Sequence, residues 1–99
     1  MPTVKFTFTL KGDIEDLEVY ANNERLEVHQ NKGQYEENLP SGSTLEVVFE
    51  ISGDNGTDYT IEYSCKSGGM KKEDPDKPSQ VEDRIQHHGY REENLSIII

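Results

Sequence analysis

The chain has 99 residues, of which 20 are acidic and 10 are basic, so its formal net charge at pH 7 is −10. This length suits one domain, and 22 Leu, Ile, Val and Phe residues are just enough large apolar side chains to build a core. The acidic balance argues against direct nucleic-acid binding and against binding to an anionic membrane, because both need a basic surface. The longest apolar run, residues 97–99, is far too short to span a bilayer.

Apolar residues stand at every second position in the first part of the chain, which is typical of strands with one buried face. Residues 4–10 form the first such stretch, and residues 17–21 and 26–28 repeat the pattern on either side of a short polar loop. This predicts a hairpin in which Val19 lies opposite Val28 and Ala21 lies opposite Leu26. A further short strand is expected at residues 35–39, before the turn-rich segment 40–43.

A second hairpin is predicted over residues 44–66. Two apolar rows would face the core, and they are Leu45, Val47, Phe49 and Ile51 on one strand and Tyr59, Ile61, Tyr63 and Cys65 on the other. A three-residue loop, Asp54 to Gly56, keeps both rows on one face by pairing Ile51 with Tyr59. Gly56 would then take the left-handed backbone conformation that such loops require.

The alternation ends at Lys66, and a long mobile loop is predicted over residues 66–78 from its Gly, Pro and clustered charges. A short helix is predicted over residues 79–89, because Ser79 and Glu82 make a capping box and Gly89 is a suitable stop. Residues 95–99 then form the last strand, and Ile98 indicates that its outer side is partly covered.

These elements predict an all-β fold, an antiparallel β-sandwich of six or seven strands with one short helix before the last strand. We expect a single β-sandwich domain over residues 1–99, immunoglobulin-like in layout but without the paired cysteines and core Trp of true immunoglobulin domains. The oligomeric state is expected to be a monomer or a weak homodimer that pairs through a strand edge at residues 4–10 or 95–99.

The negative charge is concentrated in residues 12–64, where 13 acids against two basic residues sum to −11. The alternation predicts that a set of acidic and apolar residues shares the outer surface of the strands, namely Glu18, Tyr20, Glu27, Glu46, Val48, Glu50 and Glu62. Such a face suits a non-enzymatic protein-interaction module, inhibitor-like or immunity-like toward a basic protein partner. The same pattern is also typical of a solvated face that only keeps a small β protein soluble.

An alternative interpretation is a ligand-binding sandwich for carbohydrate or Ca²⁺. Asp13, Glu15 and Asp16 are the candidate metal ligands, because carboxylate-rich loops at the end of a sandwich can supply the oxygens that Ca²⁺ prefers. Exposed tyrosines, Tyr20, Tyr35 and Tyr90, could stack against a sugar ring. None of the acidic clusters has the spacing of a known calcium loop.

The sequence contains no motif of nucleophilic, phosphate-binding or zinc-dependent catalysis, so we expect that the protein is not an enzyme and needs no cofactor. The single cysteine, Cys65, occupies an inward position, and His87 and His88 are neighbours that cannot chelate one ion together on a helix. No export signal is evident at the N-terminus, which favours a cytoplasmic protein, with secretion after removal of a signal peptide as the alternative.

Overall fold

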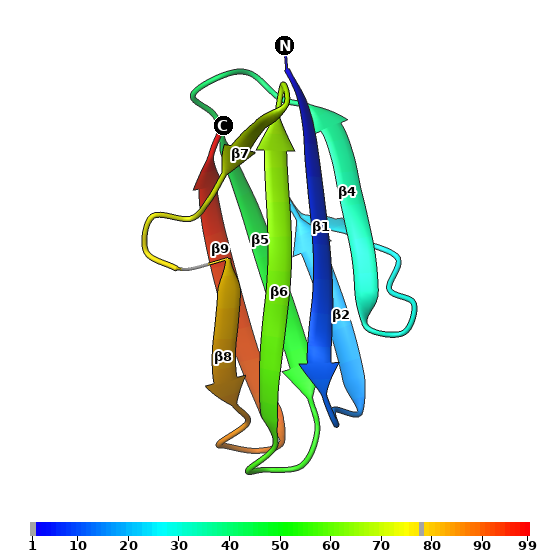
Figure 1. Cartoon of the computed structure of the whole chain (residues 1–99). Coiled ribbons are helices and arrows are strands. Elements are labelled where there is room, and N and C mark those ends of the chain that lie inside the picture. Colours follow the sequence, from blue (N-terminus) through cyan, green and yellow to red (C-terminus); the bar gives the residue numbers. More distant parts are fainter. Residues whose placement is uncertain (1, 78) are drawn as a thin grey trace.

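The computed structural model describes residues 2–77 and 79–99, and the described part of the chain contains strands and no helix (Figure 1). The strands are β1 (Thr3–Gly12), β2 (Asp16–Ala21), β3 (Glu24–Arg25), β4 (Lys32–Asn38), β5 (Thr44–Ser52), β6 (Asp58–Ser67), β7 (Met70–Lys72), β8 (Gln80–Arg84) and β9 (Tyr90–Ile98). Within these residues there is accordingly no helix that is long and apolar enough to cross a membrane.

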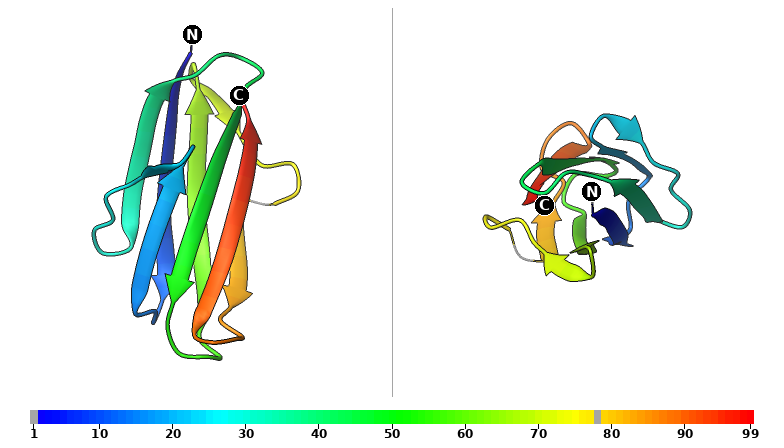
Figure 2. Two further views of the ribbon diagram at one scale, coloured as in Figure 1. Left: turned by 180° about the vertical axis from the view of Figure 1, so that it is seen from behind. Right: turned by 90° about the horizontal axis from the view of Figure 1, so that it is seen from above.

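The strands form two antiparallel sheets that pack face to face (Figure 2). Sheet A has the order β4-β1-β6, and both β7 and β8 pair with the far side of β6. Sheet B has the order β3-β2-β5-β9. The predicted all-β antiparallel sandwich is therefore confirmed, although the described residues form nine strands where six or seven were predicted. The immunoglobulin-like layout stays a prediction.

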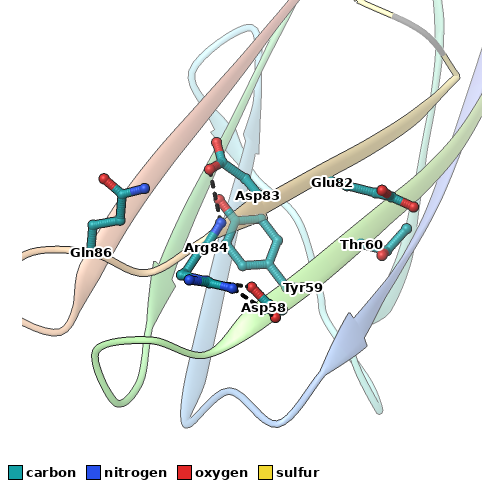
Figure 3. A pocket seen from close by; sticks show the side chains of 7 residues that line it. All are labelled: Asp58, Tyr59, Thr60, Glu82, Asp83, Arg84 and Gln86. Atoms are coloured by element: carbon teal, nitrogen blue, oxygen red, sulfur yellow. Dashed lines mark hydrogen bonds and ion pairs between the residues drawn. The ribbon is translucent and has the colours of Figure 1, made fainter.

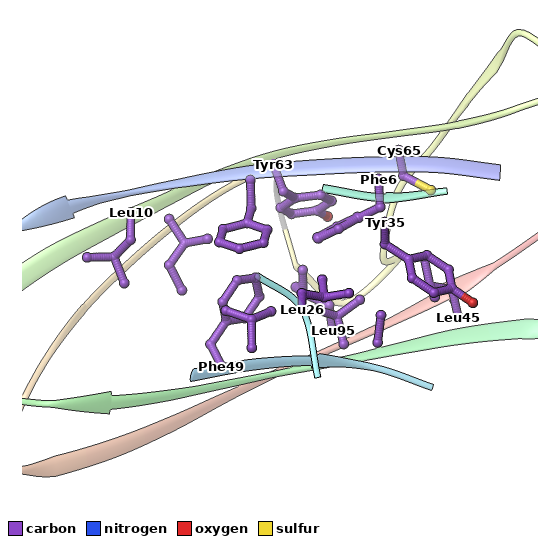
Figure 4. Packing of buried hydrophobic residues seen from close by; sticks show 14 of the residues in the cluster. Phe6, Leu10, Leu26, Tyr35, Leu45, Phe49, Tyr63, Cys65 and Leu95 are labelled. Atoms are coloured by element: carbon purple, nitrogen blue, oxygen red, sulfur yellow. The ribbon is translucent and has the colours of Figure 1, made fainter. Parts of the chain in front are cut away.

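The inward rows predicted from the alternation are confirmed, and they meet in one core between the sheets (Figure 4). Sheet A contributes Phe8, whose ring meets that of Phe49 from sheet B edge to face at a centroid distance of 5.4 Å. Within sheet A, Phe6 stacks on Tyr63 at 5.8 Å. Aromatic pairs in these geometries add to the stabilisation that burial of their apolar surface provides.

The predicted hairpin over residues 44–66 is wrong, because β5 and β6 belong to different sheets. β5 pairs with β2 and β9, whereas β6 pairs with β1, β7 and β8. The segment that contains Asn55 and Gly56 crosses from one sheet to the other, so Phe49 and Ile61 face the core from opposite sides. Alternation in the sequence indicates only which side chains are buried. The same side chains are buried whether the two strands are neighbours in one sheet or lie in two sheets that face each other across the core.

The first predicted hairpin exists, but its register differs from the prediction. Ala21 pairs with Glu24, and Tyr20 pairs with Arg25, through a two-residue turn at Asn22 and Asn23. Both turn residues have positive φ angles, 46° and 69°, as a turn that matches the twist of the strands requires. The loop therefore has two residues, whereas the predicted pairing of Ala21 with Leu26 needs a loop of four. Leu26 is buried beyond the end of β3.

The predicted helix over residues 79–89 is also wrong, because residues 80–84 form β8, which pairs with β6. Val81 lies opposite Ile61 and Asp83 lies opposite Tyr59 in this pairing. A helix of about nine residues is marginal in water, whereas the exposed backbone groups of β6 offer a full set of partners to an added strand. The tertiary contact therefore outweighs the capping signals.

The segment predicted as a loop over residues 66–78 contains ordered elements. β6 continues to Ser67, and a two-residue turn at Gly68 and Gly69 leads into β7, which pairs with β6. The last strand, predicted over residues 95–99, begins earlier, because β9 starts at Tyr90. The outer side of this strand was predicted to be partly covered, and Ile98 on that side is 59% exposed.

Candidate functional site

The outer surface of sheet B gathers most of the residues that the sequence assigns to an acidic face. Pairing of β2 with β5 and of β5 with β9 sets the positions. We call this surface the acidic face; its residues are Asp16, Glu18, Tyr20, Thr44, Glu46, Val48, Glu50, Ser52, Tyr90, Glu92, Asn94, Ser96 and Ile98. These side chains alternate with the buried rows of the same three strands, so they point away from the core.

A row of three glutamates crosses the acidic face. Glu18 lies opposite Glu50 on β5, and Glu50 lies opposite Glu92 on β9. Side chains in directly opposed positions have Cβ atoms about 4.5–5.5 Å apart, and like charges at this separation destabilise a sheet. The row therefore concentrates three negative charges across neighbouring strands.

Local partners satisfy only the first of these glutamates. Arg25 lies 3.5 Å from Glu18 Oε1, and the Tyr20 hydroxyl donates a hydrogen bond of 3.0 Å to Glu18 Oε2. Over residues 2–77 and 79–99, neither Glu50 nor Glu92 forms an ion pair. Their carboxylates can therefore accept hydrogen bonds from a bound cation.

Two tyrosines flank the glutamate row, and its glutamates raise the pKa of both. The hydrogen bond to Glu18 raises the pKa of Tyr20 above the ordinary value of a tyrosine. Partial burial raises the pKa of Tyr90, and the charges of Glu50, Glu92 and Glu18 raise it further. Tyr90 is 43% exposed, so its ring can contact a partner beside the carboxylates, and a basic side chain can stack on such a ring.

Two of the predicted face residues lie elsewhere. Glu27 follows β3 in an exposed connection, and Glu62 is on β6 in sheet A, where Lys11 Nζ lies 2.9 Å from Glu62 Oε1. The hairpin prediction placed Glu62 beside Glu50, and the structure separates them because β6 belongs to the other sheet. The sequence did not indicate Glu92, and it indicated Tyr90 only as an exposed tyrosine for sugar stacking, since residues 90–94 show no apolar alternation that would reveal a strand.

The candidate metal ligands are not brought together. Asp13 and Glu15 lie between β1 and β2, and Asp16 begins β2. Across the described residues, no group of three or more His, Cys, Asp or Glu side chains is placed to hold a metal ion. Tyr35, one of the predicted sugar-stacking residues, is buried in the core, so its ring is not presented at the surface.

A shallow depression of about 520 Å³ lies on sheet A beside β6 and β8 (Figure 3). Arg84 crosses it and forms two hydrogen bonds with the carboxylate of Asp58, of 2.6 and 3.4 Å. The guanidinium of Arg84 lowers the pKa of the Asp58 carboxyl. Because Arg84 and Asp58 satisfy each other, neither of these two charges is free to select a ligand in the depression.

A buried ionic cluster lies at the open side of the sandwich, between β8 and β9. Its centre is Glu93, which is 5% exposed and accepts hydrogen bonds from the Tyr59 hydroxyl at 2.7 Å and from Lys77 Nζ at 3.1 Å. Arg91 lies 2.8 Å from Asp83 and 3.5 Å from Glu93. Every buried charge here has a partner, so we interpret the cluster as a structural link between the two sheets. No alternation or motif in the sequence indicates it.

Comparison with known proteins adds no family to these observations. No protein-family model matches this chain, and no curated protein or solved structure is significantly similar to it.

Proposed function

We propose that this protein is a non-enzymatic protein-interaction module whose acidic face binds a basic protein partner. The row of Glu18, Glu50 and Glu92 carries the proposal, because two of its three carboxylates have no ion pair among the described residues. Like charges in opposed positions destabilise the folded protein. A basic partner would relieve this repulsion, and the relief would contribute to the free energy of binding. An acidic cleft or face also accelerates encounter with a basic partner through long-range attraction.

The apolar groups beside the row support a protein partner rather than free cations. Val48 and Tyr20 are partly exposed between the acidic residues, and Tyr90 is exposed at one end of the face. Protein interfaces combine apolar and aromatic contacts with a polar rim, and Tyr is among the residues that contribute most to binding. An inhibitor-like or immunity-like role fits the small size and the charge, with the partner's basic site as the target.

A site for carbohydrate or Ca²⁺ is the less supported proposal. It would need tyrosines at the surface and oxygen ligands in one place, and Tyr35 lies in the core while Asp13, Glu15 and Asp16 form no group of three. A cytoplasmic location and the lack of a cofactor remain predictions from the sequence.

The test compares three immobilised proteins in pull-downs from a native lysate at low and at raised salt. The first is the unaltered chain, and the second carries Glu18→Gln, Glu50→Gln and Glu92→Gln. The third is a control that removes the same charge from the outer surface of sheet A through Glu36→Gln, Glu62→Gln and Glu82→Gln. Glutamine keeps the size of the side chain and removes its charge.

We expect the unaltered chain and the control to retain a basic protein at low salt and to release it at raised salt, because salt screens exposed charges. The variant of the glutamate row should lose this partner at both salt concentrations. Equal retention by the row variant and the control would contradict the proposal, as would the absence of any basic protein bound to the unaltered chain.

A further inference from the structure

The outer edge of β9, which is the side of the strand that faces away from β5, is a further candidate binding feature. β9 is the last strand of sheet B, and among the described residues it pairs with β5 on one side and with no strand on the other. Next to this pairing, Ile99 N donates to Ser43 O at 2.8 Å and Gly42 N donates to Ile99 O at 2.6 Å. Alternate residues of an antiparallel strand direct their backbone groups to opposite sides, so those of Glu92, Asn94, Ser96 and Ile98 point away from β5.

The segment of residues 73–77, which we call the strap, covers this edge at Ser96. The Asp74 carboxylate accepts a hydrogen bond from Ser96 N at 2.7 Å, which is where a carbonyl oxygen of a neighbouring strand would accept it. Asp74 is 6% exposed, although a carboxylate is costly to bury unless it is hydrogen-bonded. It therefore replaces a missing strand at one position of the edge.

Three further contacts hold the strap in place. Asp74 Oδ1 accepts a hydrogen bond from Asp76 N at 2.8 Å, which fixes the carboxylate. Lys77 Nζ lies 3.1 Å from Glu93 Oε2 on β9, and the Tyr63 hydroxyl on β6 lies 3.3 Å from Asp74 N. The strap thus leaves sheet A after β7, is anchored to β9 of sheet B, and leads back toward β8 (Figure 1).

β4 and β9 are edge strands of sheets A and B, and they differ in the side chains that discourage the addition of another strand. On β4, Lys32, Gln34, Glu36 and Asn38 point outward and include two charges, and charged residues discourage the addition of a further strand. The outward residues of β9 include one charge, Glu92, together with Ile98, which is 59% exposed, and Tyr90. An edge with exposed apolar residues needs another means of protection, and the strap supplies it.

The outward residues of β9 are also complementary to themselves. In an antiparallel pair of two β9 strands centred on Asn94, Tyr90 of one copy lies opposite Ile98 of the other, and Glu92 lies opposite Ser96. This register pairs apolar with apolar residues and places no two glutamates opposite each other. We propose that the β9 edge is a strand-addition site for a second copy of this chain, and that the strap keeps it closed through Asp74.

The experiment measures the molar mass of Asp74→Ala by sedimentation over a wide range of protein concentration. We expect the unaltered chain to sediment as a monomer of 11.3 kDa, and Asp74→Ala to form a species of twice that mass as its concentration rises. Asp76→Ala is the matched control, because it removes the same charge from an exposed position of the same strap. Addition of Ile98→Lys to Asp74→Ala should restore the monomer, since it places a charge opposite Tyr90.

An Asp74→Ala protein that keeps its β-sheet circular dichroism and stays monomeric at every concentration would overturn the proposal. Hydrogen exchange of the unaltered chain provides a second test that needs no variant. The amide of Ser96 should exchange more slowly than that of Asn94, because Asp74 protects only the former. Equal exchange of the two amides would show that the strap does not close the edge. Both tests measure self-association and protection of the edge, so their outcome does not depend on whether the acidic face binds a basic partner.

Discussion

Cys65 combines reactive chemistry with a buried position. Its side chain is fully buried between the sheets (Figure 4), and burial raises the pKa of the thiol to about 11. The reactive form of a cysteine is the thiolate, so the thiol in the folded protein is inert near neutral pH. The single cysteine of this chain is therefore a part of the core, with the packing role of a small apolar residue.

The raised pKa predicts how stability changes in alkaline solution. A thiol in the unfolded chain has a pKa of about 8.5, so the folded state disfavours ionisation, and stability is lost as the pH rises from the unfolded pKa through about 11. We expect the ionisation of Cys65 to lower the free energy of unfolding by about 2 kcal/mol between pH 8 and pH 10. Urea unfolding at a series of pH values measures this change.

Cys65→Ala is the control for this measurement, because it removes the ionising group and keeps a small side chain in the core. Its stability should fall less over the same interval, because only the tyrosines, which are about half ionised in the unfolded chain at pH 10, then contribute to the loss. Parallel pH profiles of the two proteins would contradict the assignment of the change to Cys65.

Four two-residue turns show what single residues decide about strand pairing. Both turn residues have positive φ angles at positions 22–23, 30–31, 68–69 and 88–89. Each of these turns contains Asn or Gly, whereas the more familiar hairpin pair Asn55 and Gly56 lies in a segment that connects two different sheets. A residue that tolerates a left-handed conformation permits a tight hairpin, and the core contacts of the flanking strands decide whether one forms.

At the scale of elements, β5 is the centre of the acidic face, because it is paired on both sides within sheet B. Glu50 therefore has a like charge opposite it on each neighbouring strand, Glu18 on β2 and Glu92 on β9. Removal of the charge of Glu50 should therefore have two opposite effects. It should stabilise the fold, because the repulsion is lost, and it should weaken the attraction for a basic partner.

Glu50→Gln should accordingly raise the free energy of unfolding by roughly 0.2–1 kcal/mol at low salt. The gain should shrink as salt is added, because exposed charges are then screened. Thermal or urea unfolding at two salt concentrations checks both statements. The control is Glu36→Gln on β4, where the glutamate lies opposite Lys5 and its loss removes an attraction. An equal gain in both variants would argue against repulsion within the row.

The last third of the chain shows the limit of local signals for assigning elements. Residues 79–89 have a capping box and a stop that favour a helix, yet residues 80–84 pair with β6 as β8. The start of β9 at Tyr90 was missed because Glu92 and Glu93 are both charged while they point to opposite sides of the sheet. Glu93 is buried only because Tyr59, Lys77 and Arg91 satisfy it, and none of these partners is near it in sequence except Arg91.

At the scale of the whole molecule, the two sheets share one core, and most pairs of neighbouring strands within each sheet are not adjacent in the sequence. β1 pairs with β4 and β6, and β5 pairs with β2 and β9. Neither sheet buries its apolar side without the other. We therefore expect both sheets to unfold in a single cooperative transition.

Ile51→Val tests this expectation, because Ile51 is fully buried in sheet B. The substitution should lower the free energy of unfolding by about 0.5–1.5 kcal/mol. Hydrogen exchange should report the same loss in the slowest amides of β1 in sheet A as in those of β5. The control is Ile98→Val, which makes the same chemical change at an exposed position of sheet B and should change stability by less than about 0.5 kcal/mol. Faster exchange confined to sheet B would contradict a shared transition.

The sequence by itself determined which residues of β1, β5 and β6 are buried, that the fold is an antiparallel sandwich, and that its surface is strongly acidic. Side-chain alternation is a local property of a strand, so it can be seen without knowledge of the partner strand. Only the tertiary structure decided which strands pair, that residues 80–84 are a strand, and that Glu92 completes the row with Glu18 and Glu50. These outcomes depend on backbone hydrogen bonds and charges between residues far apart in the chain, and no local pattern records such contacts.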